Sequence, residues 1–343
     1  MTRVHNHRYN HKMSELWTDK YQPTSLEQII GNEMVRDTII DFLKSKKLPN
    51  MIFCGPHGSG KSTLARLTAQ GYLGQYLSSG YMEVIGSINR GKNVVSEKTD
   101  KAKSSDKTID GPNIINFIRK NVAIGADICK LIIVYDFDCM TTEAQMALRR
   151  IIEIYSNKVR FIFLCNNLSN IIEAIQSRTL LLKFNPVHHD LILDRLKHIA
   201  EEQKLTISPD IYRAICVLAS GDIKQALNYL QIFSQCRSGT LESFYKIFNI
   251  PSIVTVQKII TDAISQKIGL AVDRATELIN NGYNLTDILD IIIKVLIYST
   301  ELSEAQRAHM INETVKTVYI NESVQSNTQL YKLIINIARV KGV

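Results

Sequence analysis

The residues best suited to chemistry lie in the segment 55–62, which reads Gly-Pro-His-Gly-Ser-Gly-Lys-Ser. This is the complete G-x-x-x-x-G-K-[ST] pattern of a phosphate-binding loop, with an apolar run at 51–54 before it and a helical stretch at 63–72 after it. The glycines let backbone N–H groups face the phosphates at the start of that helix. Lys61 would reach the β- and γ-phosphates, and the Ser62 hydroxyl would ligate Mg²⁺. We expect His57, inside the loop, to point into solvent.

A nucleotide hydrolase also needs a carboxylate at the end of a neighbouring strand to hold Mg²⁺, and another to orient the attacking water. The apolar run Leu131–Tyr135 is followed by Asp136 and, two residues later, by Asp138. From the residues alone, Asp136 is the candidate for the metal, and no residue stands out as the base.

Short apolar runs at 51–54, 81–85, 131–135, 160–165 and 179–184 predict strands, and helical stretches such as 142–155 lie between them. Buried strands that alternate with helices favour a parallel sheet with helices on both faces. From about residue 187 only helical patterns follow. The segment 288–297 is apolar on nearly every side, which is typical of a helix buried in a core or against a partner. The fold class is therefore α/β, followed by helical domains.

Composition sets wider limits on the class of protein. The chain has 343 residues, with 41 Lys and Arg against 33 Asp and Glu, so its formal charge is +8. This length suggests two or three domains, and the basic balance favours an anionic partner. Six scattered cysteines without a C-x-x-C pair indicate core residues in a reducing compartment. No apolar run is long enough to span a membrane, and the polar N-terminus lacks the pattern of a signal peptide.

Further motifs occur in order along the chain: Trp17–Pro23, the phosphate loop, Met140–Arg150, Cys165–Asn167, Ile175–Thr179 and Gly221–Asn228. With them the chain resembles the AAA+ small subunits of replication factor C, the sliding-clamp loader. The resemblance covers about 17–232 with specific motifs and continues more weakly to the C-terminus. It implies ATP and Mg²⁺ as cofactors. The expected nucleotide-binding residues are Gly55, Pro56, His57, Gly58, Ser59, Gly60, Lys61, Ser62, Thr63, Asn166 and Lys224.

The resemblance also sets the register of the acidic motif. The family's Asp-Glu-Ala-Asp precedes Ser-Met-Thr, and here Asp138 precedes Cys-Met-Thr. Tyr135 then stands at the metal-binding Asp, and Asp136 stands at the water-positioning Glu. A Tyr lacks the carboxylate oxygen that Mg²⁺ favours, and Asp136 is one methylene short for its position. We expect ATP binding with weak hydrolysis by this chain. In the alternative, Asp136 shifts by one residue and holds the metal itself.

The family's Ser-Arg-Cys motif is present as Ser177-Arg178-Thr179. In the family this Arg reaches the neighbouring subunit's ATP site as an arginine finger, and a finger in trans can raise turnover about 10³–10⁵-fold. Lys224 replaces the lid Arg that senses the γ-phosphate and lacks its bidentate fork. A retained finger with an altered acidic motif resembles the catalytically degenerate, finger-donating small subunit, as does the insertion at 89–96.

The resemblance implies contacts with a DNA backbone. From the residues alone, only the excess of basic residues supports such contacts. Arg90 matches the Arg of the family's Asn-Ala-Ser-Asp-x-Arg-Gly box, although the Asn and Asp of that box are absent here. Arg119 and Lys120, on the following helix, are further candidates, and a solvated surface charge is the alternative for all three. Such contacts would reach phosphates only and would weaken with salt.

The resemblance thus predicts a clamp-loader small subunit that joins other subunits in a hetero-pentamer, with a sliding clamp and primer–template DNA as partners and no membrane. Its expected parts are a flexible basic tail (1–16), an AAA+ domain (17–186), a helical lid (187–237) and a helical collar (238–343). The alternatives are a catalytically active ATPase subunit of the same loader, a self-contained DNA-remodelling AAA+ ATPase, and an adaptor that binds no nucleotide. The expected location is the nucleus in a eukaryotic cell, or the site of viral DNA replication for a viral protein.

Overall fold

The computed structural model describes residues 16–88, 90–91, 114–120, 128–235, 240–299, 302–324 and 326–339. The predicted basic tail, apart from Leu16, and nearly all of a Lys/Ser-rich surface insertion that the sequence suggests at 91–107 lie outside these ranges. The chain divides into two compact units, 1–187 and 188–343.

The first unit is built on five parallel strands in the order β2-β3-β4-β1-β5. The strands are β1 (Met51–Cys54), β2 (Tyr81–Ile85), β3 (Lys130–Tyr135), β4 (Val159–Cys165) and β5 (Leu180–Lys183). All five strands expected from the sequence are therefore confirmed. The three inner strands are almost wholly buried, because helices cover both faces of the sheet.

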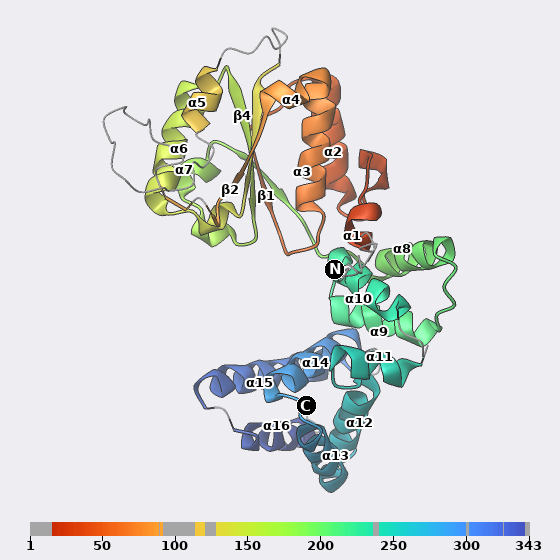
Figure 1. Ribbon diagram of the computed structural model, residues 1–343. Helices are drawn as coiled ribbons and strands as arrows, with labels where there is room; N and C mark the ends of the chain where they lie inside the picture. The colour runs from red at the N-terminus through yellow and green to blue at the C-terminus, as the bar shows by residue number, and fades with distance from the viewer. Residues whose placement is uncertain are drawn as a thin grey trace, which may run out of the picture. The chain divides into compact units, whose positions relative to one another are not determined.

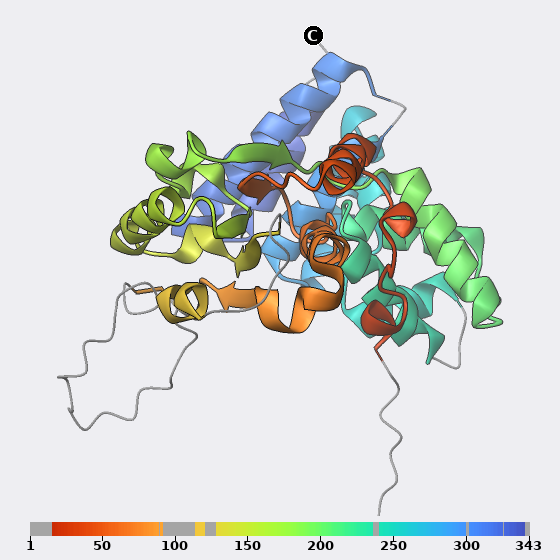
Figure 2. The same ribbon diagram turned by 90° about the horizontal axis from the view of Figure 1, so that it is seen from above.

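Each face of the sheet has its own hydrophobic core. On one side α2 (Glu33–Ser45) and α3 (Lys61–Leu73) pack over Phe53, Ile133 and Leu164. On the other side α5 (Ile114–Arg119), α6 (Thr142–Ile154) and α7 (Glu173–Gln176) pack over Ile132, Phe161 and Phe163. Figures 1 and 2 show these two helical layers from two directions. The predicted α/β architecture with two covered faces is confirmed.

Short elements complete this unit. They are α1 (Trp17–Lys20), α4 (Leu77–Gly80) and the 3-10 turns η1 (Leu26–Gln28), η2 (Gly74–Tyr76), η4 (Phe137–Cys139) and η5 (Leu168–Asn170). The turns η4 and η5 directly follow the strand ends of β3 and β4 that concern the nucleotide site.

The second unit is helical throughout its described residues. It contains α8 (His189–Glu202), α9 (Pro209–Ala219), α10 (Ile223–Ser234), α11 (Leu241–Phe248), α12 (Ile253–Ile264), α13 (Ile268–Asn280), α14 (Leu285–Tyr298), α15 (Glu304–Ser323) and α16 (Thr328–Ala338). Eight of these helices match sequence patterns at 188–203, 209–219, 222–235, 253–267, 270–280, 285–300, 304–319 and 326–339, and α11 is the one that the sequence does not predict.

Helix α14 accounts for the strongly apolar segment 288–297. Ile288, Leu289 and Ile292 are fully or almost fully buried, and the helix packs on α9, α12 and α15 of its own unit. Lys294, the one charge in this segment besides Asp290, pairs with Asp290 at 2.9 Å and donates to the Leu218 carbonyl. Contacts within the unit therefore explain most of its apolar character, and the segment is no argument for a partner by itself.

No single helix among the described residues is long and apolar enough to cross a membrane. The pair α11 and α12 reaches the length and composition of a span only jointly, with a bend of 97° between the two helices.

Candidate nucleotide-binding site

The predicted phosphate loop lies between the end of β1 and the start of α3, so the strand–loop–helix context of the motif is present. Gly55 is required by packing, because a Cβ there would lie 2.3 Å from the Phe184 carbonyl oxygen. Gly60, just before the helix, has φ +93°, which a side chain disfavours. The fold therefore requires glycine at two positions of the loop. The loop ends at a helix N-terminus, a position that favours anions.

Lys61 is buried, with 8% of its surface exposed, although it carries an ammonium group. Its Nζ donates to the carbonyl oxygens of Gly55 (2.6 Å) and Pro56 (2.7 Å) and to Oδ1 of Asn166 (3.1 Å). Buried charges need such partners, because desolvation is otherwise costly. The fold thus brings together Lys61 and Asn166, two predicted site residues 105 positions apart in the chain.

Asn166 also joins the loop through His57. Its Nδ2 lies 3.0 Å from His57 Nε2, so this exposed ring has a polar partner beyond solvent. His57 is thus exposed, in line with the expectation, and also contacts Asn166. The loop that carries Asn166 is fixed by Asp138, whose Oδ2 accepts the backbone N–H of Asn166 (3.1 Å) and Asn167 (3.0 Å). Asp138 therefore positions Asn166, a role that the sequence did not indicate.

Tyr135, at the family's metal-acid position, belongs to a cluster on the α3 side of the sheet. Its hydroxyl donates to Glu83 Oε1 (3.0 Å) and accepts from Arg66 Nε (3.1 Å), and Arg66 Nε also lies 3.1 Å from the same carboxylate oxygen. Tyr81 donates a further hydrogen bond to Glu83 Oε1. We name Arg66, Tyr81, Glu83 and Tyr135 the tyrosine–glutamate cluster.

Burial and bonding shift the titration of the tyrosine–glutamate cluster. Burial raises the pKa of Tyr135 to about 12, helped by the adjacent Glu83 carboxylate. For Glu83, burial acts to raise the pKa, but the hydrogen bonds from Tyr81, Arg66 and Tyr135 outweigh it, so that the pKa lies below its usual value. The phenol is thus neutral and the carboxylate ionised at neutral pH.

Asp136, the predicted base position, adopts a left-handed backbone conformation with φ +48°. Its Oδ2 accepts a hydrogen bond from the Ser87 hydroxyl at 2.9 Å, so the carboxylate is tied to the segment that follows β2. The described hydrogen bond of the Asp136 side chain is therefore with Ser87, and none of its described hydrogen bonds reaches the phosphate loop.

In phosphate-loop proteins, Mg²⁺ is bound by a loop hydroxyl and by a carboxylate at the end of a neighbouring strand. The hydroxyl ligand is present as Ser62, at the second position of α3. The family's metal-binding Asp is replaced by Tyr135, whose hydroxyl is bound to Glu83, and the next residue, Asp136, directs Oδ2 to Ser87. The remaining Asp138 oxygen, Oδ1, is buried from solvent, whereas Mg²⁺ usually keeps several of its waters. The residues present therefore do not fit an Mg²⁺ ion held by a carboxylate at the position of Tyr135.

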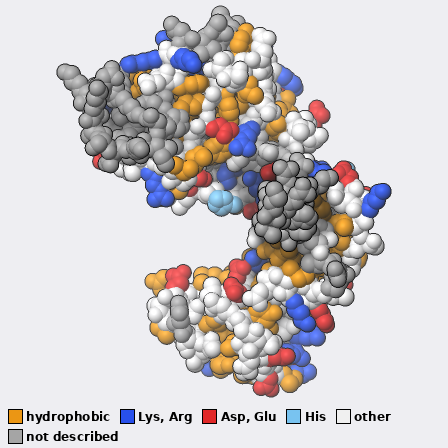
Figure 3. All heavy atoms as spheres, in the orientation of Figure 1, with side chains coloured by type: hydrophobic (Ala, Val, Ile, Leu, Met, Phe, Trp, Pro, Cys, Tyr) orange, Lys and Arg blue, Asp and Glu red, His pale blue; other side chains and the backbone are white. Residues whose placement is uncertain are grey.

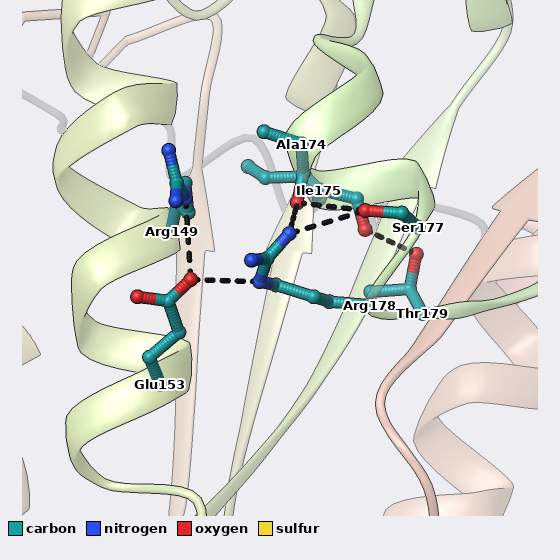
Figure 4. Close-up of polar contacts among 7 residues, drawn as sticks. All are labelled: Arg149, Glu153, Ala174, Ile175, Ser177, Arg178 and Thr179. Atoms are coloured by element: carbon teal, nitrogen blue, oxygen red, sulfur yellow. Dashed lines mark hydrogen bonds and ion pairs between the residues drawn. The ribbon is translucent and has the colours of Figure 1, made fainter.

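Arg178, the predicted finger, follows α7 and is partly exposed. Its Nε lies 2.8 Å from Glu153 Oε1, and one terminal nitrogen donates to the Ala174 carbonyl (2.8 Å) and the Ser177 hydroxyl (3.1 Å). Figure 4 shows the guanidinium between α6 and the end of α7. Glu153 also pairs with Arg149 at 3.2 Å, so one carboxylate serves two guanidinium groups.

The other predicted residues lie on surfaces. Arg90 is exposed, and its Nε donates to the Ser87 carbonyl (3.1 Å), which places it just beyond β2. Arg119 and Lys120 are exposed at the end of α5. Lys224 is exposed in the first turn of α10, in the second unit. On the face in Figure 3, basic side chains occur singly or in small groups among acidic ones. These positions leave the DNA contacts a prediction.

The chain is similar to known proteins over nearly its full length. It is 32% identical to "Replication factor C subunit 2" of Arabidopsis thaliana over 330 residues, which span 96% of this chain and 94% of that protein. The corresponding values for "Replication factor C subunit 4" of Schizosaccharomyces pombe are 31%, 94% and 91%. The chain belongs to the replication factor C small-subunit family.

Other matches agree with membership of the replication factor C family. "Replication factor C small subunit 2" of Pyrobaculum islandicum is 37% identical over 221 residues, which are 64% of each chain. Residues 251–336 match the profile of the replication factor C C-terminal domain, and 31–188 match that of the DNA polymerase III delta subunit. Among solved structures, Thermotoga maritima RuvB, a Holliday junction branch migration motor, gives a TM-score of 0.52 at 13% identity and covers 83% of this chain and 93% of its own. That likeness supports the AAA+ fold.

Proposed function

We propose that this chain is an ATP-binding small subunit of a replication factor C clamp loader, which loads a sliding clamp onto primer–template DNA during replication. Family membership over nearly the whole chain supports the clamp-loader role. The observation that carries the nucleotide role is the buried Lys61 ammonium, held by two loop carbonyls and by Asn166. Phosphate oxygens could replace these carbonyl oxygens as hydrogen-bond acceptors of the ammonium, because Lys61 is the first residue of α3 and a helix N-terminus favours anions.

Hydrolysis by this chain is expected to be weak. Metal-assisted phosphoryl transfer needs a metal ligand and a group that positions water. Tyr135 and Asp136 stand at those positions, and both are bound to neighbouring side chains. Bound ATP would then act mainly as a structural ligand that sets the conformation of the subunit, and hydrolysis at partner sites would release the loaded clamp.

Arg178 is proposed to act in trans, as an arginine finger for the ATP site of a neighbouring subunit. Its side chain is 36% exposed, and its guanidinium is held by one exposed carboxylate and by backbone and hydroxyl groups. Such surface ion pairs are weak, since water and salt screen them. A triphosphate, with its higher charge, would compete well with Glu153 for this guanidinium.

The partners proposed from the family are the other subunits of a hetero-pentamer, the sliding clamp and the DNA backbone. Arg90, Arg119 and Lys120 are the proposed DNA contacts, through phosphates and without sequence readout. We propose that 187–237 form the lid and that 238–343 form the collar; Lys224, in the lid, stays a predicted nucleotide-binding residue. Two of the relatives come from eukaryotes, which supports a nuclear location in a eukaryotic host.

Calorimetry and turnover assays on the isolated chain test this proposal. We expect saturable ATP binding, lost in Lys61→Ala, with no turnover above that of the variant. Turnover that Lys61→Ala abolishes would instead identify a catalytically active subunit of the same loader. An active homo-hexamer would point to a self-contained DNA-remodelling ATPase, and the lack of any ATP binding would identify an adaptor.

A further inference from the structure

From the tyrosine–glutamate cluster we infer that this chain binds its nucleotide as the metal-free triphosphate, with little dependence on Mg²⁺. The inference rests on the proposed nucleotide site at Gly55–Thr63 and specifies the form of ligand which that site takes. It follows from three observations: the missing carboxylate, the place of Arg66, and the fixed positive groups around the loop.

The hydroxyl of Tyr135 is not available as a substitute ligand. It donates to Glu83 and accepts from Arg66, so turning it toward a metal ion would break two hydrogen bonds of 3.0 and 3.1 Å. A neutral phenol also lacks the charge and the second oxygen through which a carboxylate binds a hard cation. The strand end that usually attracts Mg²⁺ therefore carries a neutral, anchored group.

Glu83 lies beside Tyr135 and could in principle replace the missing carboxylate, but it is already bonded. Its Oε1 receives hydrogen bonds from Arg66, Tyr81 and Tyr135. An ion pair with Arg66 at 3.1 Å balances its charge. A metal ion that recruited Glu83 would have to displace a guanidinium and two phenols at once, which makes this exchange unfavourable.

Arg66 keeps the Glu83 carboxylate engaged on the same helix face as Ser62. It lies four residues after Ser62 on α3, and residues at this spacing share one face of a helix. Its guanidinium stacks over the Tyr135 ring, 5.6 Å from the ring centre, and is thereby held in place. A divalent ion on the Ser62 hydroxyl that recruited Glu83 would leave this guanidinium without its counter-charge.

The loop itself offers positive groups to the phosphates. Lys61 supplies an ammonium, and the N-terminus of the 13-residue helix α3 supplies unpaired N–H groups and its dipole. These groups can neutralise much of the triphosphate charge that Mg²⁺ neutralises elsewhere. The site is thus arranged to retain a nucleotide while lacking the metal that its hydrolysis requires.

The test is calorimetric titration of the isolated full-length chain with ATP under two conditions. One buffer contains about 5 mM Mg²⁺, and the other contains EDTA at about a hundredfold excess over trace metal. We expect the two dissociation constants to agree within about threefold. A loss of more than about tenfold in EDTA would overturn the inference while leaving the proposed ATP site intact. Absence of binding in both conditions would refute the ATP site and the inference together.

Two variants sharpen the result. Tyr135→Phe removes the hydroxyl without adding a carboxylate, and it should stay as insensitive to EDTA as the wild type. Tyr135→Asp restores the family's acid, and in folded protein, checked by thermal melting, ATP binding should become at least about tenfold tighter in Mg²⁺ than in EDTA. Equal Mg²⁺ dependence of the folded Asp variant and the wild type would contradict the role assigned to Tyr135.

Discussion

The Nε atom of Arg178 lies 2.8 Å from Oε1 of Glu153, an oxygen that also accepts from Arg149 at 3.2 Å. Glu153 is on α6 and Arg178 follows α7, so the contact joins two elements that cover one face of the sheet (Figure 4). Both side chains are more than a third exposed. The contact therefore orients the guanidinium without locking it, which suits the proposed role of Arg178 at the ATP site of a neighbouring subunit.

Glu153→Gln tests this orienting role. The variant should fold normally and should lower the ATPase of the reconstituted complex by about two- to tenfold, less than removal of a finger would. The reason is that Arg178 keeps its charge and loses only its tether. Glu173→Gln, on the exposed surface of α7, is the matched control and should leave turnover unchanged. Wild-type turnover of Glu153→Gln would show that the tether is dispensable.

Lys61→Ala tests the nucleotide site. The change removes an ammonium that is buried among carbonyls and aimed at the loop, and ATP affinity should fall by at least about tenfold. Lys44→Ala, at a side chain that is 75% exposed on α2, serves as the control for a lost positive charge. The measurement is calorimetric titration with ATP. Equal affinity of Lys61→Ala and the wild type would place the nucleotide elsewhere.

Glu83→Gln tests the energetics of the tyrosine–glutamate cluster through pH. The pKa of Glu83 is lowered in the fold, so its carboxylate stabilises the protein above the unfolded pKa, and this contribution is lost as pH falls through the folded pKa. Because Glu83 is one-third exposed, we expect a loss of only about 1 kcal/mol at pH 7. Denaturant unfolding should show the gap between wild type and variant closing below about pH 4. Exposed Glu143→Gln should show no such gap, and a gap that persists in acid would contradict the account.

The close approach of Gly55 to Phe184 makes a steric prediction. Gly55→Ala places a Cβ 2.3 Å from the Phe184 backbone oxygen, so the loop or the segment after β5 must move. We expect a loss of several kcal/mol in unfolding free energy, or failure to fold, together with lost ATP binding. Gly269→Ala, in α13 with open space around it, should be neutral or stabilising by up to about 1 kcal/mol. Similar melting temperatures for the two variants would contradict the packing argument.

The elements of this fold follow from local patterns, whereas the bonding at its site does not. Continuous apolar runs predict the five strands, and the loop motif predicts the start of α3 within two residues. The sequence analysis misses α11, which has only eight residues, about two helical turns, and so offers a short window in which to recognise a helical pattern. It predicts Lys61 and Asn166 individually, but it contains no signal that joins Tyr135 to Glu83, 52 residues away, or Arg178 to Glu153. Such pairs arise from strand order and helix packing, and only the folded chain brings them together.

The most direct measurement of the central claim is the clamp-stimulated ATPase of the complex reconstituted with its partner subunits, with wild-type chain or Arg178→Ala. The account predicts that the variant still binds ATP with unchanged affinity, because Arg178 lies outside the phosphate loop of its own chain. It also predicts a fall in turnover of the complex of at least about tenfold, from the loss of a finger in trans. Unchanged turnover, in a complex shown to contain the variant, would contradict the account.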